Sequence, residues 1–292
     1  MITIFTPTYN RAHLLPALYE SLKQQTLKQF EWLVVDDGSR DNTAQVVADF
    51  QKDDSGFAIR YIAKPNGGKH TAINLGAREA NGQLFLILDS DDSLPRDAVA
   101  TILEEYDKVK DTPGIGGVCG LMAHHNGERI GSGLPHDVMD IDEISLRHRW
   151  HVTGDLLEVF TTEVMREFPF PEIEGERFCP EQLVWFRIAQ KYKLHCFNKV
   201  IYLRDYLEGG LTDHIVKIRM ESPVASCMTY SEMLNYDIPL TQKAKAAINY
   251  WRFYQHPRCH GVKVAWCWHL LRPLGLAMQM RDKKAVTATK QQ

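Results

Sequence analysis

Three aspartates crowd one short stretch of the chain, Asp89-Ser90-Asp91-Asp92, directly after the apolar run 84–88. An unbroken apolar run of this length is typical of a buried parallel strand. Carboxylates held so close together are costly unless a hard cation neutralises them, and Mg²⁺ or Mn²⁺ in such sites usually also binds substrate phosphates. The stretch therefore predicts that Asp89, Asp91 and Asp92 hold Mn²⁺ or Mg²⁺. The alternative is an acidic turn that caps the next helix.

Three further polar clusters each follow a predicted strand. They are Thr6-Pro7-Thr8-Tyr9-Asn10-Arg11, Asp36-Asp37-Gly38-Ser39 and Pro65-Asn66-Gly67-Gly68-Lys69-His70. Because ligands of open α/β sheets bind beyond the carboxyl ends of the strands, the four clusters predict one crevice for a nucleotide diphosphate. Tyr9 would stack on a base, Asp37 would accept a hydrogen bond from a uracil N3–H, and Lys69 at a helix start would bind phosphate or ribose. For Asp36, Ser39 and the two glycines, ordinary turn and cap chemistry is the alternative.

The elements that would position these clusters alternate along the chain. Apolar runs predict strands over 2–6, 31–36, 59–63 and 84–89, and helical spacing predicts helices over 12–25, 41–53 and 69–80. This alternation predicts an α/β fold with a mostly parallel sheet flanked by helices. Further helices are expected over 181–192 and after Pro223, with Pro273 breaking the segment 244–281.

Composition excludes several classes of protein. The chain has 292 residues, 44% hydrophobic and 24% charged, with a net charge of −3, so no basic field favours nucleic acid. Six scattered cysteines form no CxxC pair, which favours a reduced compartment over a disulfide framework or a zinc site. We expect no signal peptide and no transmembrane helix, and therefore a cytoplasmic protein.

Together the clusters resemble the family 2 glycosyltransferases. The similarity is strong over 1–95, through Thr-Pro-Thr-Tyr-Asn-Arg, Val-Val-Asp-Asp-Gly-Ser, the Asn-Gly-Gly segment and Asp-Ser-Asp-Asp, and looser to about 225. The resemblance implies a GT-A fold and metal-dependent, inverting transfer of a sugar from a nucleotide diphosphate donor to a glycan or lipid-linked hydroxyl. The expected donor is a UDP-sugar. The resemblance also implies that Asp37 reads the base and that the acidic stretch holds metal and donor. The donor-binding residues that we predict are Thr6, Pro7, Tyr9, Arg11, Asp37, Asn66, Gly68, Lys69, Asp89, Ser90 and Asp91.

The catalytic base is harder to assign. The family usually carries a Glu-Asp pair at a helix start after the acceptor region, and the matching pair here is Glu181-Gln182. Inversion needs a carboxylate that takes the proton of the acceptor hydroxyl. Either Glu181 is that base, or Asp155 is, or catalysis is impaired. A surface role for Glu181 and a turn or sugar-contact role for Asp155 are the alternatives.

Histidines and the C-terminal segment carry weaker signals. We interpret His124, His125, His148 and His151 as solvated or core residues, since no carboxylates stand near them in the sequence. The glycine-bearing loop 209–213 before His214 could close over the donor. Segment 258–284 mixes Trp and Leu with Lys and Arg, which predicts either a helix packed on the domain or peripheral contact with the inner face of a membrane.

We divide the chain into a glycosyltransferase domain, 1–225, and a helical C-terminal region, 226–292. Within the domain, 1–95 would bind the nucleotide and 96–225 the acceptor. Two other functions stay open: a non-catalytic nucleotide-sugar binding protein, which Gln182 favours, and a sugar-1-phosphate nucleotidyltransferase, which usually has a glycine-rich basic loop that this chain lacks after its first strand. A dinucleotide dehydrogenase is disfavoured because no GxGxxG follows that strand.

Overall fold

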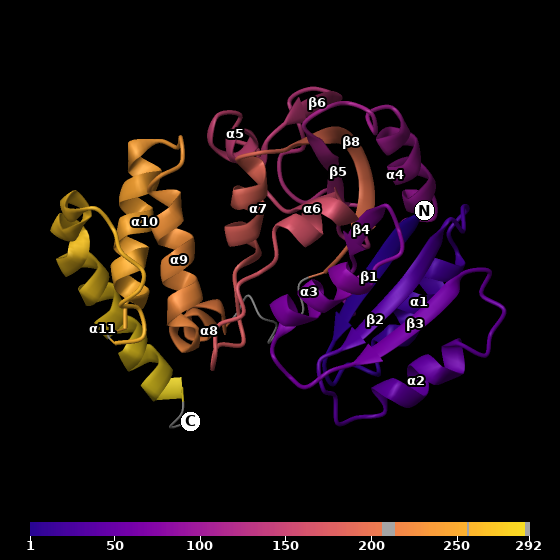
Figure 1. The fold of residues 1–292 in the computed structure, drawn as a ribbon, viewed down its shortest axis with the longest axis horizontal. Coiled ribbons are helices and arrows are strands. Elements are labelled where there is room, and N and C mark those ends of the chain that lie inside the picture. Colours follow the sequence, from indigo (N-terminus) through magenta and orange to yellow (C-terminus); the bar gives the residue numbers. More distant parts are fainter. Residues whose placement is uncertain (206–213, 256, 290–292) are drawn as a thin grey trace. The chain divides into compact units, whose positions relative to one another are not determined.

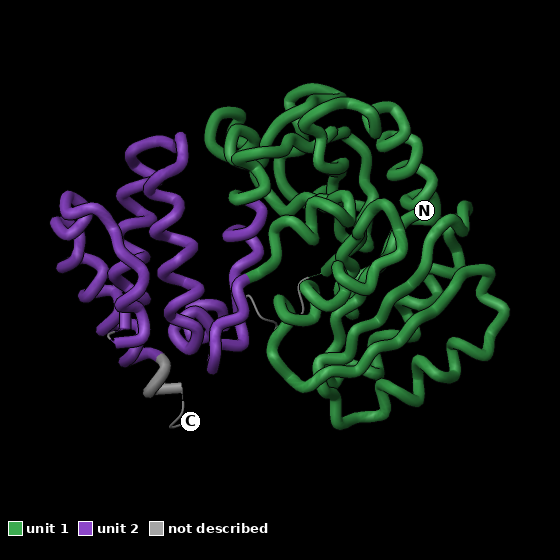
Figure 2. Tube along the Cα trace, in the orientation of Figure 1, with its two compact units in different colours: residues 1–170, 186–205 green, residues 171–185, 206–292 purple. Residues whose placement is uncertain are grey.

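The computed structural model describes residues 1–205, 214–255 and 257–289 (Figure 1). The predicted loop 209–213 lies outside these residues. The chain forms two compact units (Figure 2): unit 1 comprises Met1–Phe170 and Phe186–Asp205, and unit 2 comprises Pro171–Trp185 and Tyr206–Gln292. The predicted division near 225, between a glycosyltransferase domain and a helical C-terminal region, stays a prediction.

Unit 1 is built on an eight-stranded sheet with the order β3-β2-β1-β4-β7-β5-β8-β6. The strands are β1 (Ile2–Thr8), β2 (Phe30–Asp36), β3 (Ala58–Ala63), β4 (Leu84–Ile87), β5 (Ile115–Ala123), β6 (Val138–Ile141), β7 (Leu156–Thr161) and β8 (Lys193–Leu203). The first four strands are mutually parallel, as predicted, because each is followed by a crossover helix. Antiparallel β7 lies between β4 and β5, so the sheet is mixed beyond β4.

Helices cover both faces of the parallel strands. The helices of unit 1 are α1 (Leu15–Lys23), α2 (Thr43–Phe50), α3 (Lys69–Glu79), α4 (Ala98–Asp107), α5 (Glu143–His148) and α6 (Thr162–Glu167), and α7 (Glu181–Ala189) runs across the division between the units. Leu18 of α1 and Val47 of α2 join Trp32 of β2 in the main core. On the other face, Gly76 of α3 lies against the Phe5 ring, where an added Cβ would come within 2.3 Å of the ring.

Unit 2 is helical after α7. It contains α8 (Ile215–Glu221), α9 (Pro223–Met233), α10 (Leu240–Phe253), the 3-10 helix η2 (Trp266–Leu271) and α11 (Arg272–Thr289). Its core includes Tyr250, Trp251 and Phe253 of α10. The prediction that Pro273 breaks a helix was inexact: α11 begins at Arg272, so this proline occupies a first turn, where its missing N–H costs nothing.

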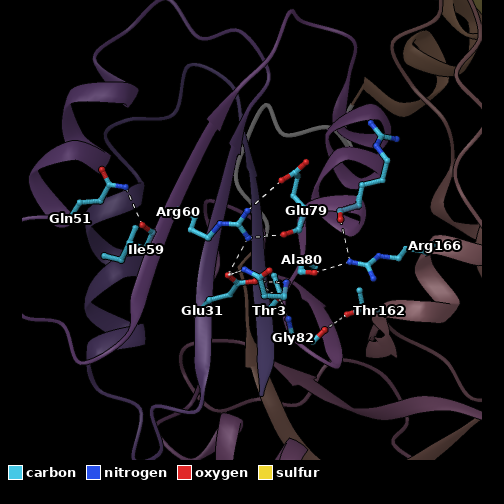
Figure 3. Close-up of polar contacts among 12 residues, drawn as sticks. Thr3, Glu31, Gln51, Ile59, Arg60, Glu79, Ala80, Gly82, Thr162 and Arg166 are labelled. Carbon is cyan, nitrogen blue, oxygen red and sulfur yellow. Dashed lines mark hydrogen bonds and ion pairs between the residues drawn. The ribbon is translucent and has the colours of Figure 1, made fainter.

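A buried carboxylate ties the amino ends of the first strands together (Figure 3). Glu31 of β2 accepts hydrogen bonds from the Thr3 hydroxyl at 2.6 Å, from the Asn81 main-chain N–H at 2.7 Å and from the Asn81 amide at 2.9 Å, and it pairs with Arg60 at 3.2 Å. Arg60 also contacts Glu79 at 3.4 Å. Burial alone would raise the pKa of Glu31, but these hydrogen bonds hold it below its ordinary value of 4.5.

Glu31→Gln should therefore destabilise the protein at neutral pH by about 1–3 kcal/mol, because a buried charged acceptor is lost. A lowered folded-state pKa contributes stability above the unfolded value of 4.5, and this contribution is lost as the pH falls through the folded value. The difference in the free energy of unfolding between wild type and Glu31→Gln should therefore become smaller in acid. Urea unfolding at neutral pH and at about pH 3.5 measures it. Glu79→Gln, which alters a more exposed partner of Arg60, is the control. A difference in the free energy of unfolding that does not change with pH would contradict the lowered pKa of Glu31.

Candidate active site

The four polar clusters lie at one edge of the sheet. β1, β2, β3 and β4 are neighbours and parallel, so their carboxyl ends meet at the same edge. The clusters begin at or just after these ends. The convergence that the sequence predicted is therefore present in unit 1, at the place where open α/β sheets bind ligands.

Asp37 organises the loop that follows β3. Its two carboxylate oxygens accept hydrogen bonds from the main-chain N–H groups of Gly67 at 2.9 Å and Gly68 at 2.7 Å and from the Asn66 amide at 3.2 Å, and pair with Lys64 at 2.6 Å. Asp37 is only 4% exposed. Four donors at four lone-pair positions hold this carboxylate, and with it the predicted base- and phosphate-binding loop, in one geometry.

Glycine is required at the end of that loop. Gly68 has a φ of +95°, which residues with a side chain rarely adopt, and it directly precedes α3. Lys69, the first residue of α3, is thereby placed beside the acidic stretch. The loop that binds Asp37 thus also sets the position of Lys69.

The loops after β1 and β2 are joined by side-chain to main-chain hydrogen bonds. Asn10, with a φ of +53°, accepts from the Arg40 N–H at 2.7 Å and donates its own N–H to the Ser39 hydroxyl at 2.8 Å. Asp36 accepts from the Ser39 N–H at 2.7 Å. The alternative of turn chemistry therefore describes Asp36 and Ser39 correctly. Tyr9 directly precedes Asn10 and is 44% exposed, as stacking of its ring on a base would need.

Asp89 and Asp91 each have a cationic partner from another cluster. Lys69 lies 2.7 Å from Asp89, and Arg11 lies 2.8 Å from Asp91. Burial alone would raise the pKa of Asp89, but the ammonium of Lys69 and the guanidinium of Arg204 hold it below its ordinary value. Lys69 and Arg11 therefore balance the negative charge of this edge in the described structure.

Asp92 lies deeper than its neighbours. It is 5% exposed, and the hydroxyl of Tyr202 in β8 donates to it at 2.6 Å, while the same hydroxyl accepts from the Asp89 N–H at 3.1 Å. Burial and the charge of Asp89 raise the pKa of Asp92 to about 7. The alternative that this stretch caps the next helix is wrong, because α4 begins only at Ala98, with Asp97 at its cap position.

The carboxylate oxygens of the acidic stretch are suitable ligands for a hard cation. The Asp89 and Asp91 side chains are 32% and 20% exposed at the edge of the sheet, and both offer carboxylate oxygens. Within the described ranges, no three Asp, Glu, His or Cys side chains converge on a single point. A metal here would compete with Lys69 and Arg11 for these oxygens.

A second charged group lies at the carboxyl end of β8. Arg204 pairs with Asp155 at 3.1 Å, and Asp205 contacts His124 at 3.1 Å and His125 at 2.7 Å. The two histidines are therefore bound to a carboxylate that is distant in the sequence, which refines their predicted solvated role. Through Arg204 this group is coupled electrostatically to Asp89 and Asp92.

A close contact of two glycines positions Asp155. Gly131 and Gly154 have φ values of +78° and +83°, and a Cβ added to Gly154 would lie 2.4 Å from the Gly131 Cα. Thr153 exchanges hydrogen bonds with Ser132, main-chain N–H to carbonyl and N–H to hydroxyl, both at 3.1 Å. Gly154 is thus needed for packing, and the ordered turn fixes the main chain of Asp155.

Other predicted site residues occupy different settings. Thr6 and Pro7 lie inside β1 and are buried, and the Thr6 hydroxyl accepts from the Trp32 indole at 3.0 Å. Ser90 is buried and lies 3.4 Å from Arg11. Glu181 is the first residue of α7, as predicted, and is half-buried in unit 2. The ligand roles of these residues stay predictions.

Sequence reasoning missed three residues of the site: Lys64, Tyr202 and Arg204. Lys64 directly precedes the Pro-Asn-Gly-Gly segment, and a search for a cation opposite Asp37 would have suggested it. Tyr202 and Arg204 follow more than 100 residues after the acidic stretch, at the end of a long strand. Nothing local in the sequence marks them.

Residues 3–155, just over half of the chain, match the family described as Glycosyl transferase family 2. The chain belongs to this family. The resemblance inferred from the motifs at the strand ends and the predicted glycosyltransferase class are thereby confirmed.

A relative from Campylobacter jejuni, GalNAc(5)-diNAcBac-PP-undecaprenol beta-1,3-glucosyltransferase, is 27% identical over 219 residues, covering 72% of this chain and 67% of the relative. Against several other curated relatives, the chain spans only 11–35% of their length.

Solved structures share the fold. S. aureus TarS in complex with UDP-GlcNAc has a TM-score of 0.62 and 19% identity, over 94% of this chain and 79% of that one. Mannosyltransferase PcManGT from Pyrobaculum calidifontis, in complex with GDP-Man and Mn²⁺, has a TM-score of 0.58 and 19% identity, over 98% and 75%. The predicted GT-A-type fold is confirmed.

Asp37→Asn should weaken UDP binding by about 1.5–3 kcal/mol, the usual loss for a hydrogen bond to a charged group. If Asp37 also reads the base, the loss should be larger for UDP than for CDP, which lacks the uracil N3–H. Calorimetry with both nucleotides measures this difference, and Asp54→Asn, an exposed aspartate, is the control. Equal losses for the two nucleotides would show that Asp37 acts only by holding its loop.

Proposed function

We propose that this glycosyltransferase moves a sugar from a UDP-sugar donor, with inversion, to a hydroxyl of a glycan or lipid-linked acceptor. The observation that carries the proposal is the convergence of Tyr9, Asp37, Lys69 and the acidic stretch at one sheet edge. Each part suits one part of the donor. Tyr9 offers an aromatic face for the base, and Lys69 and Arg11 offer positive charge for the diphosphate.

The same edge would hold a divalent metal through Asp89 and Asp91, with Asp92 fixed behind them by Tyr202. When bound, the metal supplies positive charge that stabilises the departing diphosphate. Lys69 and Arg11, which neutralise these carboxylates in the described structure, are placed to bind phosphate oxygens. The Mn²⁺ named for PcManGT supports this proposal.

The acceptor class rests on other support. The name of the Campylobacter relative describes transfer to an undecaprenol-linked glycan, and the UDP-GlcNAc named for TarS supports a uridine donor. A lipid-linked acceptor would bring the protein to a membrane, and we propose peripheral contact at its inner face through 258–284.

Glu181 is the proposed catalytic base. It opens α7, where the helix dipole stabilises a negative charge, and Gln182 cannot accept a proton in its place. Asp155, whose carboxylate pairs with Arg204 at 3.1 Å, is the second candidate. That ion pair competes with an acceptor hydroxyl for the oxygens of Asp155.

UDP binding should require a divalent metal, because Lys69 and Arg11 leave Asp89 and Asp91 uncompensated beside the diphosphate when they move to the phosphates. We expect Mn²⁺ to raise the affinity at least about tenfold, and Asp91→Asn to remove most of this gain. Calorimetry with Mn²⁺ and with EDTA measures both. The control is Asp97→Asn, whose carboxylate pairs with Lys199 and lies beyond the acidic stretch. Equal UDP affinity in Mn²⁺ and EDTA would exclude the metal.

Glu181→Gln should leave UDP affinity nearly unchanged and lower turnover by about 10²–10⁴, the usual effect of removing a general base. Turnover is measured with donor saturating, so that binding and chemistry separate. Glu174→Gln, an exposed neighbour in the sequence, is the control. Gln182→Asp should be tolerated.

Full activity in Glu181→Gln together with its loss in Asp155→Asn would transfer the role of base to Asp155. A wild-type protein that binds UDP but turns over no donor with any acceptor would instead favour the non-catalytic binding function.

A further inference from the structure

Helix α11 packs on α10 through small and polar residues. A Cβ added to Gly275 would lie 2.3 Å from the Trp251 Cβ, so only glycine permits this approach of the two helices. Gln279 is buried, and its amide donates to the Tyr254 carbonyl at 3.2 Å. Further along, Asp282 binds Arg252 through two contacts of 2.5 and 2.9 Å. Gly275, Gln279 and Asp282 recur at helical spacing, so together they define the inner face of α11.

The large apolar side chains of the same segment are exposed. Trp266 is 82% exposed, Leu270 78%, Leu274 54%, Met278 37% and Met280 60%. Four of them, Trp266, Leu270, Leu274 and Met278, recur every four residues, and we call these four the outer apolar face; Met280 lies on another side of α11. A helix of a water-soluble domain normally turns its apolar side chains to the core and its polar ones to water. α11 has the reverse arrangement, with a polar inner face and apolar side chains outside.

Contacts with α10 anchor the part of the chain that carries Trp266 and Leu270. Trp251 of α10 donates its indole N–H to the Trp268 carbonyl at 2.9 Å, and its ring contacts that of His269 with centroids 4.8 Å apart. Arg272 lies over the Trp251 ring at 5.2 Å. Because η2 and the start of α11 are both fixed to Trp251, Trp266 and Leu270 are presented from an ordered support.

Charge separates this segment from the rest of the chain. The protein as a whole has a net charge of −3, yet residues 257–292 contain seven Lys or Arg and a single acidic residue, Asp282, which Arg252 neutralises. Arg281, Lys283 and Lys284 are exposed at the turns that follow the apolar side chains. The segment therefore combines an exposed apolar face with an excess of positive charge.

We infer that the outer apolar face, with the basic residues beside it, docks on the surface of an anionic lipid bilayer. Apolar side chains would enter the boundary of the acyl chains while Arg and Lys bind lipid phosphates, as in interfacial helices. The excess of like charge disfavours a second copy of this face as the partner. Of the helices that the structure describes, none is both long enough and apolar enough to cross a bilayer, which agrees with docking on the surface.

The outer apolar face belongs to unit 2, whereas the proposed donor site belongs to unit 1. The inference specifies the surface by which the proposed membrane contact would be made, and its test contains no nucleotide or acceptor. Failure of this test would leave donor binding and turnover untouched, and failure of the proposed reaction would leave this test unchanged.

The experiment is flotation of the full-length protein with vesicles of phosphatidylcholine alone or with phosphatidylglycerol added. We expect binding to the anionic vesicles, weakened by salt. Leu270→Ser and Leu274→Ser should each lower the partition coefficient about tenfold, because each removes one large apolar side chain from the lipid boundary. Leu240→Ser, 72% exposed in α10, is the matched control and should bind like wild type.

Two further variants separate charge from apolar contact. Arg281→Glu combined with Lys284→Glu should abolish the preference for anionic vesicles, whereas Lys245→Glu, an exposed lysine of α10, should not. Because the substituted side chains are exposed, we expect each variant to keep wild-type thermal unfolding and UDP affinity.

Brominated lipid should quench Trp266, and this part of the quenching should disappear in Trp266→Phe. A wild-type protein that does not float with anionic vesicles at low salt would overturn the inference. So would serine variants that float like wild type, or a dimer in solution that the serine variants abolish.

Discussion

The neutralisation of negative charge at one end of four parallel strands is the constraint on which the site depends. Asp37, Asp89, Asp91 and Asp92 lie at one edge of the sheet because parallel strands bring their carboxyl ends to a common edge. Each carboxylate has a donor from another cluster or strand, so the loops are held by charge-assisted hydrogen bonds as well as by packing. The acidic edge and the loops around it are therefore one interdependent arrangement.

The proposed donor site differs in burial from one ion pair to the next. Ion pairs between partly exposed groups contribute little net stability, so Lys69 and Arg11 would lose little if they exchanged carboxylates for phosphates. Asp37 and Asp92, in contrast, are almost fully buried, and removing their partners would leave buried carboxyl groups without hydrogen bonds. The buried contacts hold the geometry of this edge, and the exposed pairs are the ones that the proposed donor would displace.

The two units differ in which side chains they bury. Unit 1 buries apolar side chains on both faces of its sheet and leaves its polar residues at the strand ends. Unit 2 has its own aromatic core around Trp251, but uses glycine and polar contacts to attach α11. Large apolar side chains of α11 are thereby left exposed.

The sequence by itself determined the parallel strands, their crossover helices and the motifs at the strand ends. Those features follow from local periodicity and from turn residues, which act over a few positions. Only the tertiary structure decided which cation meets which carboxylate, since Tyr202 reaches Asp92 across 110 residues of sequence. It also placed β7 between β4 and β5, and it left large apolar side chains of α11 exposed, where the sequence had left a packed helix and a membrane-contacting segment both open. Pairings between distant segments depend on the path of the whole chain, and no local pattern of residues encodes that path.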